Sequence, residues 1–192
     1  MPDPNPTVME FLLTRRSRPS KTLTAPAPTR DELMPILTAA ARSPDHGKLE
    51  PWRFIVLQPA ALARLAELAA IRAEALGVAP EQLAKTQSSL RGAPLAVAVI
   101  AAPKPSGKIP EIEQLYSAGA VCLALLNAAH AAGWGANWLS GWAAHDRGFV
   151  EEGLGLAPAE RVAGIIHIGT ETSTPPERPR PDLDAITEWV EA

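Results

Sequence analysis

The chain has few of the residues on which several protein classes depend. Its single cysteine, Cys122, lies in an apolar run and has no neighbouring metal ligand, so we expect it to pack as a small hydrophobic residue. No run of five basic residues occurs and the formal net charge is −3, which argues against nucleic-acid binding. The first residues have neither the basic start nor the apolar core of a signal peptide, so we expect a cytoplasmic location.

Familiar catalytic motifs are also missing. The sequence has no Gly-x-Gly-x-x-Gly after a strand, no Walker phosphate loop and no Gly-x-Ser-x-Gly nucleophile turn. Its four histidines lack the spacing of metal ligands, so we predict no metal site. A dinucleotide, if the protein uses one, is therefore not held in a Rossmann crevice.

What the chain does have is enough apolar sequence for one domain. Its 192 residues are 46% hydrophobic, which predicts a single domain over residues 1–192 with a substantial core. Helices that separate strands predict an α/β or α+β sandwich, with helices packed against one sheet. Apolar periodicity and turn residues predict strands at 52–58, 95–101, 136–140 and 162–168, and helices at 7–16, 30–41, 59–76, 80–90, 115–132, 146–154 and 182–190.

Two of these helices leave a question open. Residues 115–132 are apolar nearly all round but barely long enough for a membrane span. The segment also contains Tyr116, Ser117, Asn127 and His130. Such a helix is normally buried in a core or in a subunit contact, so we expect no membrane association. In the helix that starts at the capping box Thr29–Glu32, Pro35 either kinks the helix or shifts its start.

The end of the first helix carries a candidate anion site. Arg15 continues the apolar face of Val8 and Leu12, which we expect to face the core, and an inward-facing arginine needs a compensating anion. Guanidinium groups bind phosphate in a bidentate manner, which makes Arg15–Ser17 a candidate phosphate clamp. The alternative is a salt bridge between Arg15 and a carboxylate such as Glu10.

The stretch Arg42–Phe54 joins a helix to a strand and is rich in turn residues. Pro44 ends the helix, and the turn that follows presents His46. Arg42 lies opposite the apolar face of its helix, so it points away from its own core and could serve a neighbouring subunit. His46 could donate or accept a proton near neutral pH; the alternative is an ordinary connection whose histidine is merely solvated.

Taken together, these segments resemble the FMN-dependent nitroreductase family, and specifically its compact single-domain subgroup. Four blocks occur in the family's order, and residues 168–170 close the last strand. The blocks are Arg15–Ser17, Arg42–Phe54, Lys108–Gln114 followed by Ser117–Ala120, and Gly133–Gly141. The resemblance implies an α+β fold, with a central, mostly antiparallel sheet flanked by helices and the long apolar helix at a dimer interface.

The resemblance also implies a homodimer with two FMN sites in the subunit interface. Arg15, Arg16 and Ser17 match positions that hold the flavin from one subunit. Arg42 and His46 match positions supplied by the other. The late segment that lines the isoalloxazine is matched by Trp138, Leu139 and Ser140. A stretch linked with nicotinamide cofactor binding is matched by Ala128, Ala129, His130, Ala131, Ala132 and Gly133.

The implied activity is an NAD(P)H oxidoreductase with FMN as cofactor. NADH or NADPH is the reductant, and a nitroaromatic, a quinone or a related electron-poor acceptor follows in the same pocket by a ping-pong mechanism. No catalytic side chain is required, in line with the missing nucleophile motifs. Alternatives are a flavin-binding protein of the same fold with little turnover, and a specialised flavin enzyme for dehalogenation or biosynthetic oxidation.

The chain departs from the subgroup at two positions. Leu139 stands where arginine is usual, and Ile112 where tryptophan is frequent. The first change removes a cation from the expected site, and Arg178 or Arg180 in the proline-rich segment 172–181 could replace it. The second would alter the substrate pocket.

Overall fold

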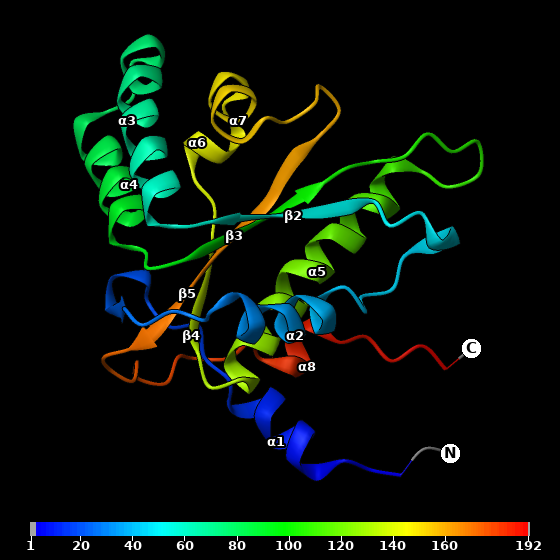
Figure 1. Cartoon of the computed structure of the whole chain (residues 1–192). Coiled ribbons are helices and arrows are strands. Elements are labelled where there is room, and N and C mark those ends of the chain that lie inside the picture. The colour runs from blue at the N-terminus through cyan, green and yellow to red at the C-terminus, as the bar shows by residue number, and fades with distance from the viewer. Residues whose placement is uncertain (1–2, 192) are drawn as a thin grey trace.

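An antiparallel sheet of five strands forms the middle layer of the protein in the computed structural model, which describes residues 3–191 (Figure 1). The strands are β1 (Leu23–Thr24), β2 (Trp52–Leu57), β3 (Ala96–Ala101), β4 (Gly135–Leu139) and β5 (Arg161–Glu171). The long strand β5 pairs with β3, β4 and, near its end, β1, and β2 lies beyond β3. The predicted sheet is confirmed.

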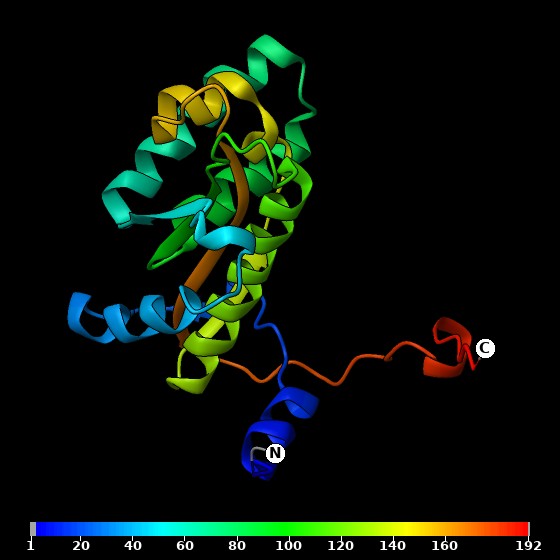
Figure 2. The ribbon, with the colours of Figure 1, turned by 90° about the vertical axis from the view of Figure 1, so that its right-hand side faces the viewer.

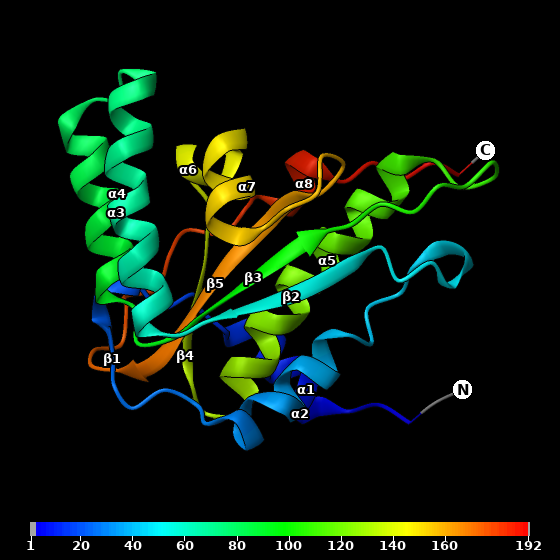
Figure 3. The same ribbon diagram turned by 45° about the horizontal axis from the view of Figure 1, so that its top comes forward.

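Helices cover both faces of this sheet (Figure 3). One core contains side chains of α3 (Pro59–Leu76), α4 (Pro80–Gly92), α6 (Trp142–His145) and α7 (Arg147–Leu154). The other contains side chains of α2 (Arg30–Ala40) and α5 (Glu111–Ala131). The remaining elements are α1 (Pro6–Thr14), α8 (Leu183–Ile186) and the 3-10 turns η1 (Ser20–Thr22) and η2 (His46–Lys48). The α+β sandwich predicted from the sequence is therefore confirmed.

The apolar run of β3 explains its central place. Every residue of this strand is buried, because β2 and β5 pair with its edges and helices cover both of its faces. Val97 and Val99 enter the core beneath α5, whereas Ala98 and Ile100 enter the core beneath α3. A strand covered on both faces has no need for alternating polar residues.

Local sequence signals set the ends of α2 and α3. The Thr29 backbone N–H donates to Glu32 Oε2 at 2.8 Å, and the Glu32 N–H donates to Thr29 Oγ1 at 3.4 Å, which completes the capping box. The start of α2 is therefore not shifted, and Pro35 lies inside the helix. Helix α3 begins at Pro59 and ends at Gly77, whose φ of 65° suits glycine.

Helix α5 is a core helix with one uncovered face. Among the described residues it is the one helix long and apolar enough to cross a membrane, but 44% of its most apolar window is buried inside the protein. The predicted burial in a core is confirmed for one face of the helix, whereas Ile112, Tyr116 and Leu123 are exposed in the single chain. The subunit contact that the sequence also suggested for this helix stays a prediction.

Two terminal segments project from the body on the side of α5 (Figure 2). Contrary to the sequence prediction, α1 does not face its own core: none of its residues is buried, and Val8 and Leu12 are each 50% exposed. The helix predicted over 182–190 is also wrong beyond Ile186, where α8 ends. A short helix gains most of its stability from packing, and the side chains of residues 183–191 are all exposed in the described part of the chain.

Candidate functional site

The segment after α1 runs alongside β4, at an edge of the sheet. The backbone N–H of Arg18 donates to the Ala136 carbonyl oxygen at 2.9 Å, and the Asn137 side-chain amide donates to the Arg18 carbonyl oxygen at 2.7 Å. These two bonds fix residues 15–18 beside the strand that leads to Trp138–Ser140. The first and the last of the predicted flavin-binding blocks are therefore brought together.

Arg15 is half-buried at this edge and lacks an acidic partner within residues 3–191. Its Nη2 donates to Ser17 Oγ at 3.2 Å, whereas Nε is buried and has no hydrogen-bond partner in that part of the chain. The alternative salt bridge to Glu10 is not formed there. Burial lowers the pKa of Arg15, and nearby arginines, Arg180 first, lower it further. An anion bound here would relieve both effects.

The extended segment after β5 docks against this arginine cluster. Arg16 donates from Nε and Nη2 to the Pro176 carbonyl oxygen at 3.3 and 3.1 Å. Arg180 pairs with Glu177 at 2.7 Å and lies close enough to Arg15 to affect its pKa. Arg178 and Arg180 were the two candidates to replace the arginine absent at position 139. Of these, Arg180 lowers the pKa of Arg15.

The loop between α2 and β2 is anchored on α5 through a buried hydroxyl. Ser117 Oγ donates to the Pro44 carbonyl oxygen at 2.9 Å and accepts from Trp52 Nε1 at 3.2 Å. Beyond this anchor, Arg42 and His46 are exposed. Arg42 is exposed as predicted, but α2 ends at Ala40, so Arg42 lies in the turn after the helix and not on one of its faces.

Three residues of this loop have positive φ angles, two of which are not glycine. Gly47 has φ +73°, and two non-glycine residues, Lys48 and Glu50, have φ +55° and +48°. Asp45 Oδ1 accepts from the backbone N–H of Leu49 at 2.6 Å and of Glu50 at 3.3 Å. Such conformations are uncommon for side-chain-bearing residues and persist only where surrounding contacts impose them. The hydrogen bonds of Asp45 therefore hold the turn that carries His46 in one conformation.

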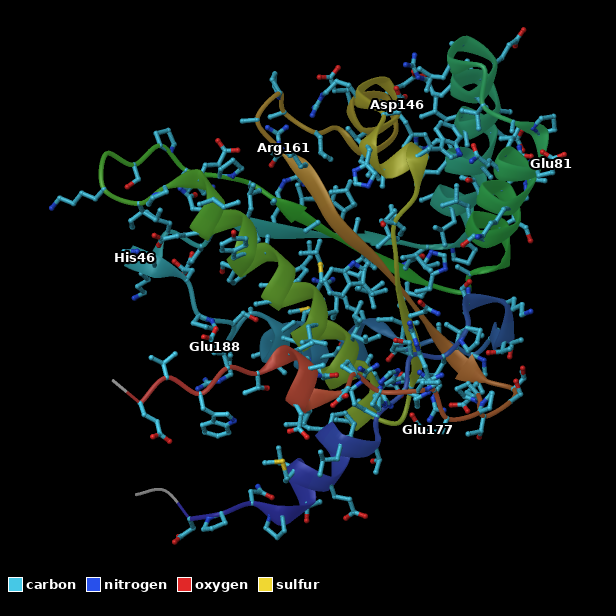
Figure 4. The ribbon with its side chains drawn as sticks, turned by 180° about the vertical axis from the view of Figure 1, so that it is seen from behind. His46, Glu81, Asp146, Arg161, Glu177 and Glu188 are labelled. Atoms are coloured by element: carbon cyan, nitrogen blue, oxygen red, sulfur yellow. The ribbon has the colours of Figure 1, made fainter. Side chains whose placement is uncertain are left out.

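The two halves of the predicted flavin site lie at opposite ends of α5. His46 Nδ1 is 2.7 Å from Glu113 Oε2, beside the N-terminal end of the helix (Figure 4), so His46 is more than a solvated side chain. The arginine cluster lies at the other end, where Arg15 affects the pKa of His130. From residue 113 to residue 130, at 1.5 Å per residue, the separation is about 26 Å. One chain alone does not bring the two halves together.

A cavity of about 670 Å³ lies beside β4 and β5, among α4, α6 and η1. Leu139 and Ser140 line it, together with the exposed side chains of Lys21 and Lys85. Trp138 faces the other side of the sheet, where its indole lies so close over Gly164 that a Cβ there would collide with it. Hydroxyl and amide side chains complete the polar lining: Ser20, Gln82, Thr86, Ser88, Ser89 and Asn137. Cavities of this size accommodate cofactors and drug-sized molecules.

His167 also lines this cavity and was not among the residues predicted from the sequence. It is 2% exposed, and its Nδ1 has no hydrogen-bond partner among the described residues. Burial lowers the pKa of His167 to about 4, so the imidazole is neutral at pH 7. The signal that could have revealed it is one polar residue within the apolar run Ile165–Ile168.

The stretch predicted to bind a nicotinamide cofactor, residues 128–133, forms the end of α5 and the turn after it. His130 Nε2 is bonded to the Ala136 carbonyl oxygen at 3.1 Å, and burial lowers the pKa of His130. Ala132 and Gly133 line a different cavity, of about 530 Å³, beside α2. Within one chain this stretch does not line the 670 Å³ cavity.

Comparison with known proteins gives consistent matches. The profile described as the Nitroreductase family matches residues 12–170. A protein of Haemophilus influenzae, provisionally named an NAD(P)H nitroreductase, is 37% identical over 84% of this chain and 87% of its own length. Escherichia coli K12 YdjA, with the same provisional name, is 34% identical over 84% of this chain and 87% of its own length.

Solved structures share the fold. A nitroreductase-like family protein from Bacillus cereus matches with a TM-score of 0.80 and 24% identity over 100% of both chains. A nitroreductase-class protein from Desulfovibrio desulfuricans, solved in complex with FMN, matches with a TM-score of 0.75 and 23% identity over 99% of this chain and 100% of its own. The profile match and the two relatives together establish that this chain belongs to the nitroreductase family.

Proposed function

We propose that the protein is an FMN-dependent NAD(P)H oxidoreductase that reduces nitroaromatics, quinones or related electron-poor acceptors. The observation that carries this proposal is the half-buried Arg15 guanidinium, whose Nε lacks a partner in the described residues, at the edge of β4. The names of the relatives support the nicotinamide reductant, and the FMN complex of a structural neighbour supports the cofactor.

The residues present fit FMN in two places. Arg15, Arg16 and Ser17 would hold the phosphate, because they supply guanidinium and hydroxyl donors without an acidic neighbour in direct contact. Leu139 and Ser140 would border the ring system in the 670 Å³ cavity. Trp138, on the other face of β4, would not enter this cavity within the same chain.

The protein's part in the reaction is to bind, orient and tune. When bound, FMN supplies transfer of a hydride or of electrons between the nicotinamide and the acceptor. Lys21 and Lys85 favour negative charge in the cavity that they line. The apolar side chains of Leu90, Phe149 and Ile165 exclude water from its inner wall. No nucleophilic side chain is needed, and a single pocket for reductant and acceptor predicts ping-pong kinetics.

We further propose a homodimer in which each site is shared. His46, bonded to Glu113, lies about 26 Å along α5 from the arginine cluster, and Arg42 belongs to the same loop. Two copies related by a two-fold axis, with their α5 helices antiparallel, would bring one subunit's Arg42 toward its partner's Arg15. The exposed α5 face of Ile112, Tyr116 and Leu123 supplies apolar surface for this contact.

A flavin-binding protein with little turnover is the second candidate. Leu139 favours it, because this residue brings an apolar side chain to the cavity where the subgroup usually has arginine. A specialised flavin enzyme for dehalogenation or biosynthetic oxidation remains the third.

Colour and bleaching separate these candidates. The purified protein should be yellow, release FMN on denaturation, and lose its colour when mixed anaerobically with NADH or NADPH. Reoxidation by a nitroaromatic or a quinone should follow, with parallel lines in double-reciprocal plots. Bound flavin that neither nicotinamide bleaches would favour the low-turnover candidate. A colourless protein that cannot be reconstituted with FMN would contradict every flavin-based candidate.

A further inference from the structure

His167 occupies an unusual position for a polar side chain. It lies on β5, opposite Asn137 of β4 and Ala96 of β3, so strands flank it on both sides. Its neighbours Ile166 and Ile168 point to the opposite face, into the core that contains α5. Directly opposed residues of an antiparallel pair share a face, and Asn137 and His167 both line the 670 Å³ cavity.

The described part of the chain leaves one nitrogen of this imidazole without a hydrogen bond. Nδ1 is buried and has no partner within residues 3–191, and the nearest polar neighbour across the strand, Asn137, uses its amide N–H on the Arg18 carbonyl oxygen. A buried polar atom without a partner is destabilising, and buried polar groups in native proteins are almost always bonded. His167 therefore has a hydrogen-bonding capacity that the folded chain leaves unused.

The charge state of His167 fixes what it can recognise. Burial lowers the pKa of His167 to about 4 and so holds the imidazole neutral at pH 7. A neutral imidazole offers one N–H donor and one nitrogen acceptor. It suits an uncharged heteroaromatic edge that carries carbonyl and N–H groups, rather than a phosphate or carboxylate.

We propose that His167 is the residue of this chain that hydrogen-bonds the ring system of the flavin, at the inner wall of the cavity. The inference rests on the proposed function, because it assigns the cavity to the isoalloxazine. It separates recognition into two parts. Arg15 and Ser17 recognise the phosphate, and His167 recognises the heteroaromatic ring.

Two flavins distinguish these parts. FMN and riboflavin carry the same ring system, but riboflavin lacks the phosphate. The Kd of the apoprotein for each is measured by quenching of flavin fluorescence, for the wild type, H167L and R15Q. H167L should raise both Kd values by the same factor, about tenfold for one lost hydrogen bond. R15Q should raise the Kd for FMN and leave that for riboflavin unchanged.

Stability supplies an independent readout. Because H167L removes an unsatisfied buried polar group, the Tm of the apoprotein should stay the same or rise, while flavin affinity falls. H167Q, which keeps a polar side chain, should recover part of the affinity. His145 on α6 is exposed and does not line the cavity, so H145L is the matched control and should leave both Kd values unchanged. If H167L does not fold, H167M serves as the apolar variant.

Each remaining outcome counts against the proposal in a recognisable way. Unchanged Kd values in the apolar variant, or a loss confined to FMN, would overturn the role of His167 and leave the proposed function standing. Wild-type apoprotein that binds neither flavin would overturn the proposed function and this inference with it.

Discussion

At the scale of single residues, two buried polar groups carry most of the functional argument. Arg15 and His167 each keep a nitrogen out of water without a protein partner among the described residues. They differ in charge: Arg15 lies among other cations, whereas burial keeps His167 neutral. Arg15 is suited to an anion, and His167 is suited to an uncharged polar group. FMN has a phosphate at one end and an uncharged heteroaromatic ring at the other.

The depressed pKa of His167 makes a prediction for the apoprotein. An unfolded histidine binds a proton near pH 6.5, but His167 in the fold does so only near pH 4. The contribution of this residue to the free energy of unfolding is therefore greatest above pH 6.5. It falls as the pH drops toward 4, because the unfolded state then binds more protons than the folded state. Between pH 7 and pH 5 the loss is about 2 kcal/mol.

Urea unfolding of the apoprotein at pH 7 and pH 5 measures this loss. H167L should lose about 2 kcal/mol less than the wild type over the same interval. H145L, which changes an exposed histidine, should behave as the wild type does. Equal losses in wild type and H167L would show that His167 is not held neutral by the fold.

At the scale of elements, a substitution in the loop around η2 can show whether the backbone conformation of this loop is required for FMN binding. In G47A, alanine at φ +73° would be strained, and its Cβ would collide with Ile109. We expect a stability loss of about 1–2 kcal/mol, together with weaker FMN binding because His46 is displaced. Chemical denaturation and flavin titration measure the two effects.

The matched control for this loop lies at the end of α3. Gly77 also has a positive φ, +65°, but a Cβ there would meet nothing within 4 Å. G77A should therefore lose stability through backbone strain alone, about 1 kcal/mol, with no change in FMN affinity. Parallel loss of FMN affinity in both variants would mean that the effect at Gly47 is one of general stability.

Elements with local signals were predictable from the sequence, and elements that need a second surface were not. The capping box of α2, Pro59 at the start of α3 and the apolar run of β3 each specify structure from neighbouring residues. The apolar face of α1 was predicted to pack on the core of its own chain, and this is wrong, because periodicity does not say which surface covers a face. For the same reason the helix predicted over 182–190 is longer than α8, which ends at Ile186.

For the candidate site, the sequence indicated residues by their type. The segments that contain Arg15–Ser17 and Trp138–Ser140 lie side by side, because Arg18 is hydrogen-bonded to Ala136 and Asn137. Their role in flavin binding stays a prediction. His167 was not predicted, because the sequence does not distinguish a histidine that is hydrogen-bonded in the core from one whose Nδ1 lacks a partner in the described residues. The orientation of Trp138, away from the cavity that Leu139 lines, depends on strand register.

At the scale of the whole molecule, the uncovered face of α5 predicts the assembly. Leu123 is 45% exposed at the middle of that helix, and L123E would place a charge in the proposed interface. We expect the variant to be monomeric and to lose flavin together, as measured by light scattering and absorbance in one run. Ile71 on α3 is 64% exposed, so I71E is the control and should remain dimeric and yellow. A monomeric L123E that retains FMN would contradict a shared site.

The placement of His46 and Arg15 beside opposite ends of α5 also has a thermodynamic consequence. In the proposed assembly neither subunit owns a complete site, so subunit association and cofactor retention become one linked equilibrium. Each association event completes two sites. At free flavin concentrations well above its Kd, the apparent dissociation constant of the dimer therefore falls with the square of the flavin concentration. Protein abundance itself then helps to set the fraction of subunits that carry cofactor, and dilution alone would empty them.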